Sequence, residues 1–549
     1  MIFTPKWLKT LPILLSLSSA STAIFAGAIS VEPTVPLFDN LGKHHHAITT
    51  TSPLAQRYFD QGLRLVFAFN HNEAIAAFKQ AAELDPNCAM CYWGIALAMG
   101  PNINLPMDLK QEPHAYESAQ KARALAAKAT KSERAYIEAL THRYAQEPGA
   151  NRVARDASYA QAMRDVAKRF PQDADAATLF AEALMDLQPW DYWTHEGQPK
   201  GAIKEIVTTL EGALKKNANH PGACHYYIHA VEASLEPQRA LRCARNLPNL
   251  MPGAGHLVHM PAHVFMRLGY YAEAVAANIQ AADVDHHYIQ DRKPQGFYPL
   301  MYYPHNLHFL YAAASMSGQS EQAINAARAL TEKVTPEIVR DFPSAELVLP
   351  TPLYALARFG KWDEILKASQ PPKDLTYTTG IWHFTRGLAF AAKGELAAAN
   401  AELDALKKLA DQQAADHIIG LNSSKTLLKI ASNVLTGEVE NRQGQTDNAV
   451  RALREALTLE DTLTYDEPQA WYQPVRQVLG AILLAANKTA DAENVYREDL
   501  KKNPDNGWSL FGLKRSLESQ QKTKDATVVD TRLKKAWQSA DVTLTASRF

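Results

Sequence analysis

Residues 55–88 read AQRYFDQGLRLVFAFNHNEAIAAFKQAAELDPNC, and this stretch decides the fold. Small, aromatic and alanine residues recur in it at helical spacing, at Tyr58, Gly62, Leu65, Ala74, Phe78, Ala81 and Pro86. The small residues let two antiparallel helices approach, the aromatic residues fill the space between neighbouring hairpins, and the proline ends the second helix. The pattern predicts a helix-turn-helix unit that cannot bury its apolar faces alone.

This unit resembles the tetratricopeptide repeat. Comparable units are expected to begin near Ala174, Pro221, Gly255, Pro304, Glu346, Gly380, Ile430 and Gln473. The resemblance implies an all-α fold, a right-handed solenoid of helical hairpins, of the type found in exported bacterial repeat proteins. It says little about function, because such repeats bind many unrelated partners.

The expected organisation of the chain follows from these units. We predict a signal peptide (1–28), a flexible N-terminal segment (29–52), partly irregular N-terminal repeats (53–170), histidine-rich units with two insertions (171–345), C-terminal units (346–520) and a capping helix or tail (521–549). The tract His44-His45-His46 falls in the segment expected to be flexible, where it reads as a solvated tract that binds metal loosely at most.

The first residues follow the order of a secretory signal. A short basic stretch from Met1 to Lys9 precedes the mostly apolar run from Leu11 to Leu17, and small residues follow up to Ala28, where cleavage is expected. No later segment has the uninterrupted apolar length that spans a bilayer, so no membrane span is expected in the mature form. We therefore expect a periplasmic or secreted protein.

Charge and cysteine content narrow the choice of partners. The chain has 57 basic and 58 acidic residues and no Lys/Arg-rich tract, so nucleic acid is not an expected partner. Cys224 and Cys243 fall on the two helices of one expected hairpin, where a disulfide would contribute about 3 kcal/mol. Cys88 and Cys91 form a CxxC that lacks the further ligands of a zinc site, and whether they pair stays open.

Seven histidines take equivalent places in three successive units. We call them the histidine stripe: His225, His229, His256, His259, His263, His305 and His308. In tetratricopeptide repeats these places on the first helix face the concave groove, one turn apart on one face. The three units offer twelve such places, and at the chain-wide frequency of 19 histidines in 549 residues about 0.4 of them would be expected to hold histidine, so chance is a poor explanation.

Imidazoles spaced in this way predict a metal site. Pairs at i and i+3 or i+4 share a helix face, and neighbouring helices lie about 10 Å apart, so that ligands from several units can converge on copper, zinc or iron. Two other interpretations stay open: a metal-free groove whose imidazoles bind a polar or anionic ligand, and histidines that serve packing alone.

Further residues near the stripe complete the expected site. Glu232 and Glu182 are placed to supply a carboxylate ligand, and Glu232 is the candidate general base. Two insertions interrupt the repeat spacing on either side of the stripe, and insertions in repeat proteins often border the binding face. Their aromatic residues are expected to line the groove, at Trp190, Trp193, Tyr302 and Tyr303.

Two classes of function are compatible with these patterns. The first is an exported scaffold that holds a peptide, a protein or a small molecule in a histidine-lined groove, with a bound transition metal. The second is a metal-dependent enzyme on the same solenoid: a copper or iron oxidase or oxygenase, or a zinc hydrolase. The fold favours the scaffold, whereas seven inward imidazoles exceed what peptide binding ordinarily needs.

Overall fold

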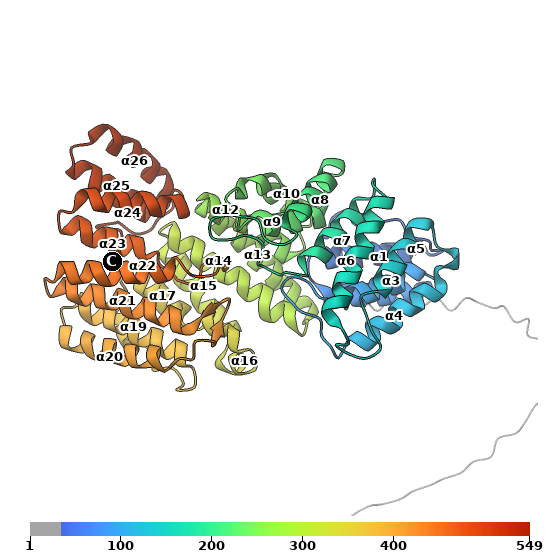
Figure 1. Ribbon diagram of the computed structural model, residues 1–549, viewed down its shortest axis with the longest axis horizontal. Coiled ribbons are helices and arrows are strands. Elements are labelled where there is room, and N and C mark those ends of the chain that lie inside the picture. The colour runs from blue at the N-terminus through green and yellow to red at the C-terminus, as the bar shows by residue number, and fades with distance from the viewer. Residues whose placement is uncertain (1–34) are drawn as a thin grey trace, which may run out of the picture.

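The computed structural model describes residues 35–549, so the expected signal peptide at 1–28 lies outside the described residues. Helical hairpins stack in chain order into an elongated array (Figure 1). Helices α1 to α7 lie at one end of the array and α23 to α26 at the other, with the helices that carry the histidine stripe between them. The predicted all-α solenoid is confirmed.

The hairpins follow one another with short turns. They are α1 (Pro53–Phe67) with α2 (His71–Leu84), α3 (Ala89–Ala98) with α4 (Glu112–Leu125), α5 (Lys131–Thr141) with α6 (Arg152–Arg169), α7 (Ala174–Met185) with α8 (Ile203–Lys216), α9 (Pro221–Val231) with α10 (Leu241–Leu250), α11 (Gly255–His259) and α12 (Pro261–Leu268) with α13 (Tyr271–Arg292), α14 (Tyr303–Met316) with α15 (Ser320–Lys333), α17 (Thr351–Arg358) with α18 (Trp362–Lys367), α19 (Thr376–Ala392) with α20 (Leu396–Gln412), α21 (Ser424–Arg442) with α22 (Thr446–Glu460), α23 (Val475–Ala485) with α24 (Thr489–Lys502), and α25 (Gly507–Ser519) with α26 (Thr523–Ala536).

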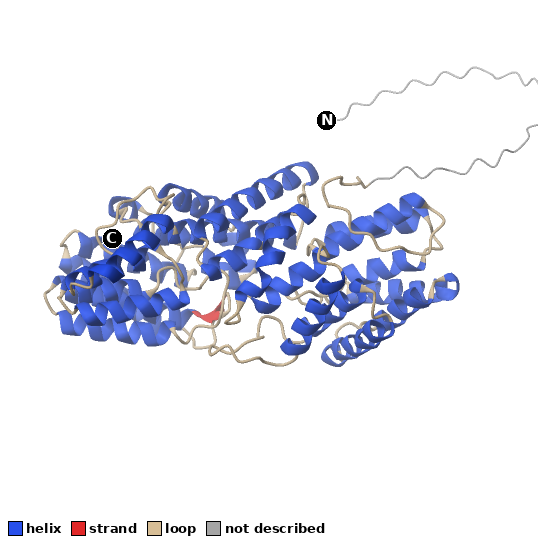
Figure 2. Cartoon of the chain, turned by 90° about the horizontal axis from the view of Figure 1, so that it is seen from above, coloured by secondary structure: helices blue, strands red, loops and turns tan. Residues whose placement is uncertain are grey.

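Shorter elements connect the hairpins. They are the 3₁₀ turns η1 (Ala126–Lys128), η2 (Pro237–Ala240) and η4 (Pro343–Val348), the π-helical turn η3 (Tyr298–Tyr302), the helix α16 (Pro336–Asp341), and the two-stranded ladder of β1 (Ile418–Ile419) and β2 (Asn422–Ser423). The ladder is a minor feature of a helical molecule (Figure 2). Across residues 35–549, no helix combines the length and the apolar composition that crossing a membrane requires.

The first hairpin shows why the repeat pattern gives this fold. A Cβ atom at Gly62 would lie 2.7 Å from the ring of Phe78, so only glycine lets α1 and α2 approach this closely. Gly94 of α3 packs against the same ring, which is fully buried. α2 ends at Leu84, directly before Asp85-Pro86, as a proline at that place requires.

Residues 35–52, expected to be flexible, lie in extended form along α1. The side chain of Gln61 accepts a hydrogen bond from the Phe38 amide (2.8 Å) and donates one to the carbonyl of Pro36 (2.9 Å). Arg64 donates through Nε to the carbonyl of His44 (2.7 Å). We call residues 35–52 the N-terminal strap. Many of its backbone polar groups bond to side chains of α1, and the amide of Thr49 bonds to Glu133 on α5, which composition alone does not reveal.

The far end of the chain also folds back onto the array. The predicted capping helix is present as α26, and the residues after it return to the C-terminal hairpins. Ser547 donates to the carbonyl of Gln477 (2.6 Å), and the side chain of Asp541 accepts from the amide of Ser320 (2.7 Å). The loop at residues 461–474, between α22 and α23, reaches inward to the histidine stripe.

Candidate metal centre

Six of the seven stripe histidines lie together in the middle of the array. We call them the histidine cluster: His225 and His229 on α9, His256, His259 and His263 on α11 and α12, and His305 on α14. The five from α9, α11 and α12 are 0 to 2 % exposed. The cluster is therefore enclosed, whereas the sequence led us to expect an open groove.

The turn between α1 and α2 contributes to this enclosure. The ring of Phe69 lies 4.5 Å from that of His225 and 5.6 Å from that of His256, measured between ring centroids. From the C-terminal part of the chain, the loop at residues 461–474 brings the carboxylate of Glu467 to His263. Segments some 400 residues apart thus cover the same group of imidazoles.

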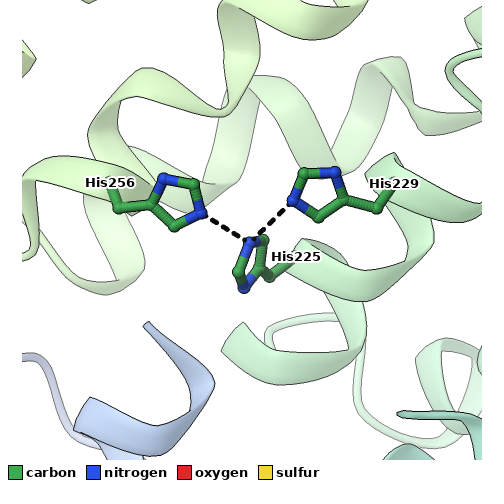
Figure 3. A group of neighbouring side chains, drawn as sticks. All are labelled: His225, His229 and His256. Atoms are coloured by element: carbon green, nitrogen blue, oxygen red, sulfur yellow. Dashed lines mark hydrogen bonds between the residues drawn. The ribbon is translucent and has the colours of Figure 1, made fainter. Parts of the chain in front are cut away.

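The first triad consists of His225, His229 and His256 (Figure 3). The Nε2 atom of His225 lies 3.2 Å from that of His229 and 3.1 Å from that of His256. His225 donates its Nδ1 proton to the carbonyl of Phe67 (2.7 Å), and His229 donates its Nδ1 proton to Glu232 (2.7 Å). In their neutral forms, both rings therefore present a lone pair at Nε2.

The protonation state of the first triad follows from burial. Burial and the nearby imidazoles hold the pKa of His225 well below its usual range and lower the pKa of His229 to about 3. The pKa of His256 is also held well below its usual range, first by burial, and its buried Nδ1 atom has no hydrogen-bond partner. Three neutral imidazoles meet here, two of them with their lone pairs facing each other.

The second triad consists of His259, His263 and His305. The Nε2 atoms of His259 and His263 lie 2.7 Å apart, and the His305 ring lies 4.8 Å from that of His259. Asn278 on α13 orients His259: its amide nitrogen donates to the carbonyl of Ala274, so its oxygen faces the Nδ1 proton of His259 (2.7 Å). His259 also presents a lone pair at Nε2.

His263 differs from the other histidines because two carboxylates adjoin it. Its Nδ1 atom lies 2.5 Å from an oxygen of Glu232 and 2.7 Å from one of Glu467. Burial alone would lower the pKa of His263, but the charges of Glu467 and Glu232 outweigh it and raise the pKa to about 10. The resulting imidazolium donates its Nε2 proton to His259, which explains the short distance between these two rings.

Glu232 connects the two triads. One of its oxygens accepts from His229 of the first triad and the other from His263 of the second, and the side chain is 1 % exposed. Both oxygens face Nδ1 atoms, so the carboxylate orients the rings from outside instead of joining the Nε2 atoms. Burial and the charge of Glu232 raise the pKa of Glu467, whose other oxygen accepts from Tyr465 (2.6 Å).

The aromatic residues named from the sequence take different places. The ring of Trp190 lies 5.3 Å from that of His229, and the ring of Tyr302 lies 4.5 Å from that of His256. Trp193 donates its indole proton to the carbonyl of Ala230, next to the cluster on α9. Tyr303 points elsewhere and lies beneath the ammonium group of Lys333. The two insertions thus wall the first triad chiefly with Trp190 and Tyr302.

Two other candidates lie apart from both triads. Glu182 is buried beside Arg143 and Asp186, where burial and the charge of Asp186 raise its pKa well above the usual value. His308 stacks on Tyr311 and lines a cavity of about 80 Å³, which His263, Phe309 and Glu467 also border. The cavity therefore adjoins the second triad. Neither Glu182 nor His308 donates a ligand atom to a triad.

Three residues of the site were not anticipated: Phe67, Asn278 and Glu467. Phe67 acts through its carbonyl, which carries no sequence signal. Asn278 is one polar residue within a helix, and Glu467 stands in a loop about 200 residues after His263. Only the tertiary fold brings these acceptors to the imidazoles.

A second group of histidines surrounds Asp175 on α7. One oxygen of Asp175 accepts from Nε2 of His44 and Nε2 of His220 (both 2.9 Å), and the other accepts from Nδ1 of His46 (2.8 Å). Each imidazole N–H thus has an acceptor, and the group is complete as a hydrogen-bonded set. It fastens the N-terminal strap to α7 and α9, and each of its three imidazoles pairs a donor with an acceptor.

The four cysteines form two disulfides. Cys224 and Cys243 join α9 to α10, with their Cα atoms 5.0 Å apart, and this bridge stands next to His225. Cys88 and Cys91 join the start of α3 to its own first turn. Both pairs are buried.

The comparisons with known proteins concern the repeat. The family model described as "Tetratricopeptide repeat" matches residues 55–88. Comparison with curated proteins finds no significant match. Among solved structures, the APC/C hetero-tetramer Cut9–Hcn1 is similar at 13 % identity over 84 % of this chain and 76 % of that chain, with a TM-score of 0.31.

Two further solved structures are also distantly similar. The human IFIT1 dimer with m7Gppp-AAAA has 12 % identity over 81 % of this chain and 90 % of that chain, with a TM-score of 0.31. The P58(IPK) TPR domain has 11 % identity over 86 % of this chain and 99 % of that chain, with a TM-score of 0.20. Similarity this distant carries no information about ligands. The matched repeat is the first hairpin of the α-helical solenoid described above, an architecture suited to protein–protein interaction.

Proposed function

We propose that this protein binds a transition metal in the histidine cluster. One observation carries the proposal: the Nε2 lone pairs of His225 and His229 face each other at 3.2 Å, because the Nδ1 proton of each ring is held by an outside acceptor. Two facing lone pairs repel in the neutral state, and a cation between them removes this repulsion. Outside acceptors at Nδ1 are also the usual partners of metal-binding histidines.

The two interpretations that compete with metal binding fit less well. A peptide or protein cannot contact side chains that are 0 to 2 % exposed, so the cluster does not suit a groove ligand. Histidines that serve packing alone should pair donor with acceptor, as His44, His46 and His220 do at Asp175. In the first triad, by contrast, acceptor meets acceptor. Protein partners would have to use other surfaces of the solenoid.

The ligand atoms indicate which metals fit. Each triad offers neutral imidazole nitrogens, which suit copper, zinc and iron, whereas magnesium and calcium require oxygen ligands. Glu232 supports the rings through Nδ1, as carboxylates do in the second layer of such sites. In the second triad the metal would replace the proton between His259 and His263, so binding there releases a proton.

The leader sequence and the cysteines support an exported location for this function. The basic, apolar and small-residue order of residues 1–28 is that of a secretory signal, and both disulfides fit an oxidising compartment. We propose a periplasmic or secreted protein. Release of a shortened form that starts after Ala28, detected by mass spectrometry of the exported fraction, would support this; a retained leader on all the protein would oppose it.

Metal analysis of untagged protein tests the proposed function. The wild type and the His114→Ala variant, which removes a histidine that is 69 % exposed, are expected to retain the same metal content after dialysis. The double variant His225→Ala/His229→Ala is expected to lose the metal of the first triad. Equal metal content in all three proteins, or none in the wild type after loading with copper or zinc, would contradict the proposal.

A metal-dependent enzyme is the second candidate, and the cavity favours it. About 80 Å³ of space borders both His263 and Glu467, so a small molecule there would lie next to the second triad and to a carboxyl group able to exchange a proton. Turnover that depends on the loaded metal and is lost in Glu467→Gln, with metal content unchanged, would support this candidate. Metal binding without turnover of any oxidase or hydrolase substrate would leave the binding function alone.

A further inference from the structure

The two triads adjoin each other across the helix pair α9 and α12. Ring centroids of His229 in the first triad and His263 in the second lie 5.3 Å apart, and those of His256 and His259 lie 5.9 Å apart. Imidazoles of different triads are thus as close as imidazoles within one triad, where the distances run from 4.6 to 6.2 Å. The two sets of ligands form one continuous cluster.

A single carboxylate couples the two sets. Glu232 accepts from Nδ1 of His229 with one oxygen and from Nδ1 of His263 with the other, so the orientations of these two rings depend on the same side chain. α11 and α12 couple them again, because His256 belongs to the first triad and His259 and His263, one and two turns later, to the second. A change in the orientation of the rings in one triad is therefore expected to change their orientation in the other.

We propose that the two triads hold two copper ions as one dinuclear centre, with Glu232 as the residue that positions both. This inference rests on the metal-binding function proposed above and specifies its stoichiometry and its metal. Two-metal sites in proteins place their ions about 3.5–4 Å apart. Between the triads, the rings of His229 and His263 contact edge to face and those of His256 and His259 are stacked, so the two triads are close enough to hold two ions at about this separation.

Electrostatics select copper among the metals that imidazole suits. Once a metal has replaced the Nε2 proton of His263, the six ligands are neutral imidazoles. The rings of Phe69, Trp190, Tyr302 and Phe309 contact them, so this part of the site screens charge weakly. Two monovalent ions repel each other about a quarter as strongly as two divalent ions. Copper has a monovalent state, and the nearby carboxylates of Glu232 and Glu467 offset part of the remaining charge.

Copper counting combined with electron paramagnetic resonance tests the dinuclear centre. The full-length protein is loaded with Cu(I) without oxygen, dialysed, analysed for copper, and then oxidised with ferricyanide before its spin is integrated. We expect two copper ions per chain and an integrated spin far below the copper content, because adjacent Cu(II) ions couple magnetically. Two ions with full spin, or one ion per chain, would overturn the dinuclear inference and leave metal binding intact.

Variants in each triad separate this inference from the proposed function. His225→Ala in the first triad and His305→Ala in the second are each expected to retain one copper ion with its full spin after oxidation. The control His114→Ala should keep two coupled ions. Circular dichroism of each variant shows whether the helices are retained, and the wild-type measurement needs no variant at all. A wild type that binds zinc but no copper would overturn the inference alone, and one that binds neither metal would overturn the proposed function as well.

Discussion

His225 and His229 face each other through their Nε2 atoms, 3.2 Å apart, while the Nδ1 atom of each donates a proton away from the other. The pair follows from the local helix: residues at i and i+4 share a face of α9. The two rings are oriented by different kinds of acceptor: the His225 ring by a tertiary partner, the carbonyl of Phe67, and the His229 ring by a local one, Glu232 three residues later at the end of the same helix. Glu232 also accepts from His263 on α12, so local and tertiary contacts together orient the imidazoles of the site.

Replacing Glu232 by glutamine is expected to weaken copper binding by about 10–100-fold, the usual effect of losing a partner behind a metal ligand. The amide has one acceptor for two Nδ1 protons, so one ring loses its orientation. Competition with a copper chelator measures the affinity. Unchanged affinity together with an unchanged coupled spin would show that Glu232 does not position the rings.

Replacing Asn278 by alanine is expected to weaken copper binding at the second triad by about 10–100-fold, because His259 loses the acceptor of its Nδ1 proton. Asn400→Ala is a matched control: that side chain makes the same bond to the carbonyl four residues earlier, on the distant helix α20. Chelator competition on both variants separates the two effects. Equal loss in the two variants would attribute the effect to the helix instead of the metal site.

The Asp175 group should make the attachment of the N-terminal strap depend on pH. Burial would raise the pKa of Asp175, but hydrogen bonds from His220, His44 and His46 hold it well below 3.8, so its stabilising contribution is present above about pH 4 and is lost in acid. Burial would lower the pKa of His46, but Asp175 raises it above 6.5. The stabilisation that protonated His46 contributes is therefore present below about pH 6.5 and is lost as the pH rises through the raised pKa.

Hydrogen exchange of the strap amides measures this dependence. Protection within residues 35–52 is expected to be highest between about pH 4 and 6.5 after correction for intrinsic exchange. Asp175→Asn should flatten the dependence of protection on pH. Glu117→Gln is the control: it removes the carboxylate of an exposed histidine–carboxylate pair, His114 with Glu117, and should leave the pH dependence as in the wild type. A wild-type profile as flat as that of Asp175→Asn would refute the role given to Asp175.

Phe78 is the packing residue on which the first hairpin depends, so Phe78→Ala is expected to destabilise the N-terminal repeats by about 3–5 kcal/mol. The ring is fully buried and contacts Gly62 and Gly94, which cannot move in to fill the space. Val153→Ala, at a side chain 83 % exposed, is the control. Urea unfolding followed at the N-terminal helices should show the difference; a loss below about 1 kcal/mol would contradict this account of the packing.

The sequence allowed the fold and most of the candidate ligands to be predicted because both depend on local periodicity. The expected units at Ala174, Pro221 and Gly255 begin where α7, α9 and α11 begin. Repeat register also placed six histidines on facing surfaces. His308 shares that register, but it lies one turn beyond His305 on α14, where the stripe passes from the cluster to the cavity beside it.

The enclosure of the site could not be predicted in this way. Register places side chains on the inner face of a solenoid, but it does not reveal how tightly the array closes. Here the turn that carries Phe69 and the loop that carries Glu467 fill the inside, so the expected open groove is a buried cluster. The strap was misjudged for a related reason: its partners, Gln61, Arg64 and Asp175, lie on helices, and its own composition is that of a solvated tract.

The most direct test of metal binding is anomalous diffraction from crystals soaked in copper, recorded at wavelengths on both sides of the copper absorption edge. If the first triad binds copper, an anomalous peak is expected within about 2.0–2.1 Å of the Nε2 atoms of His225, His229 and His256. A peak elsewhere on the protein, or no peak among these imidazoles at saturating copper, would contradict copper binding by this triad.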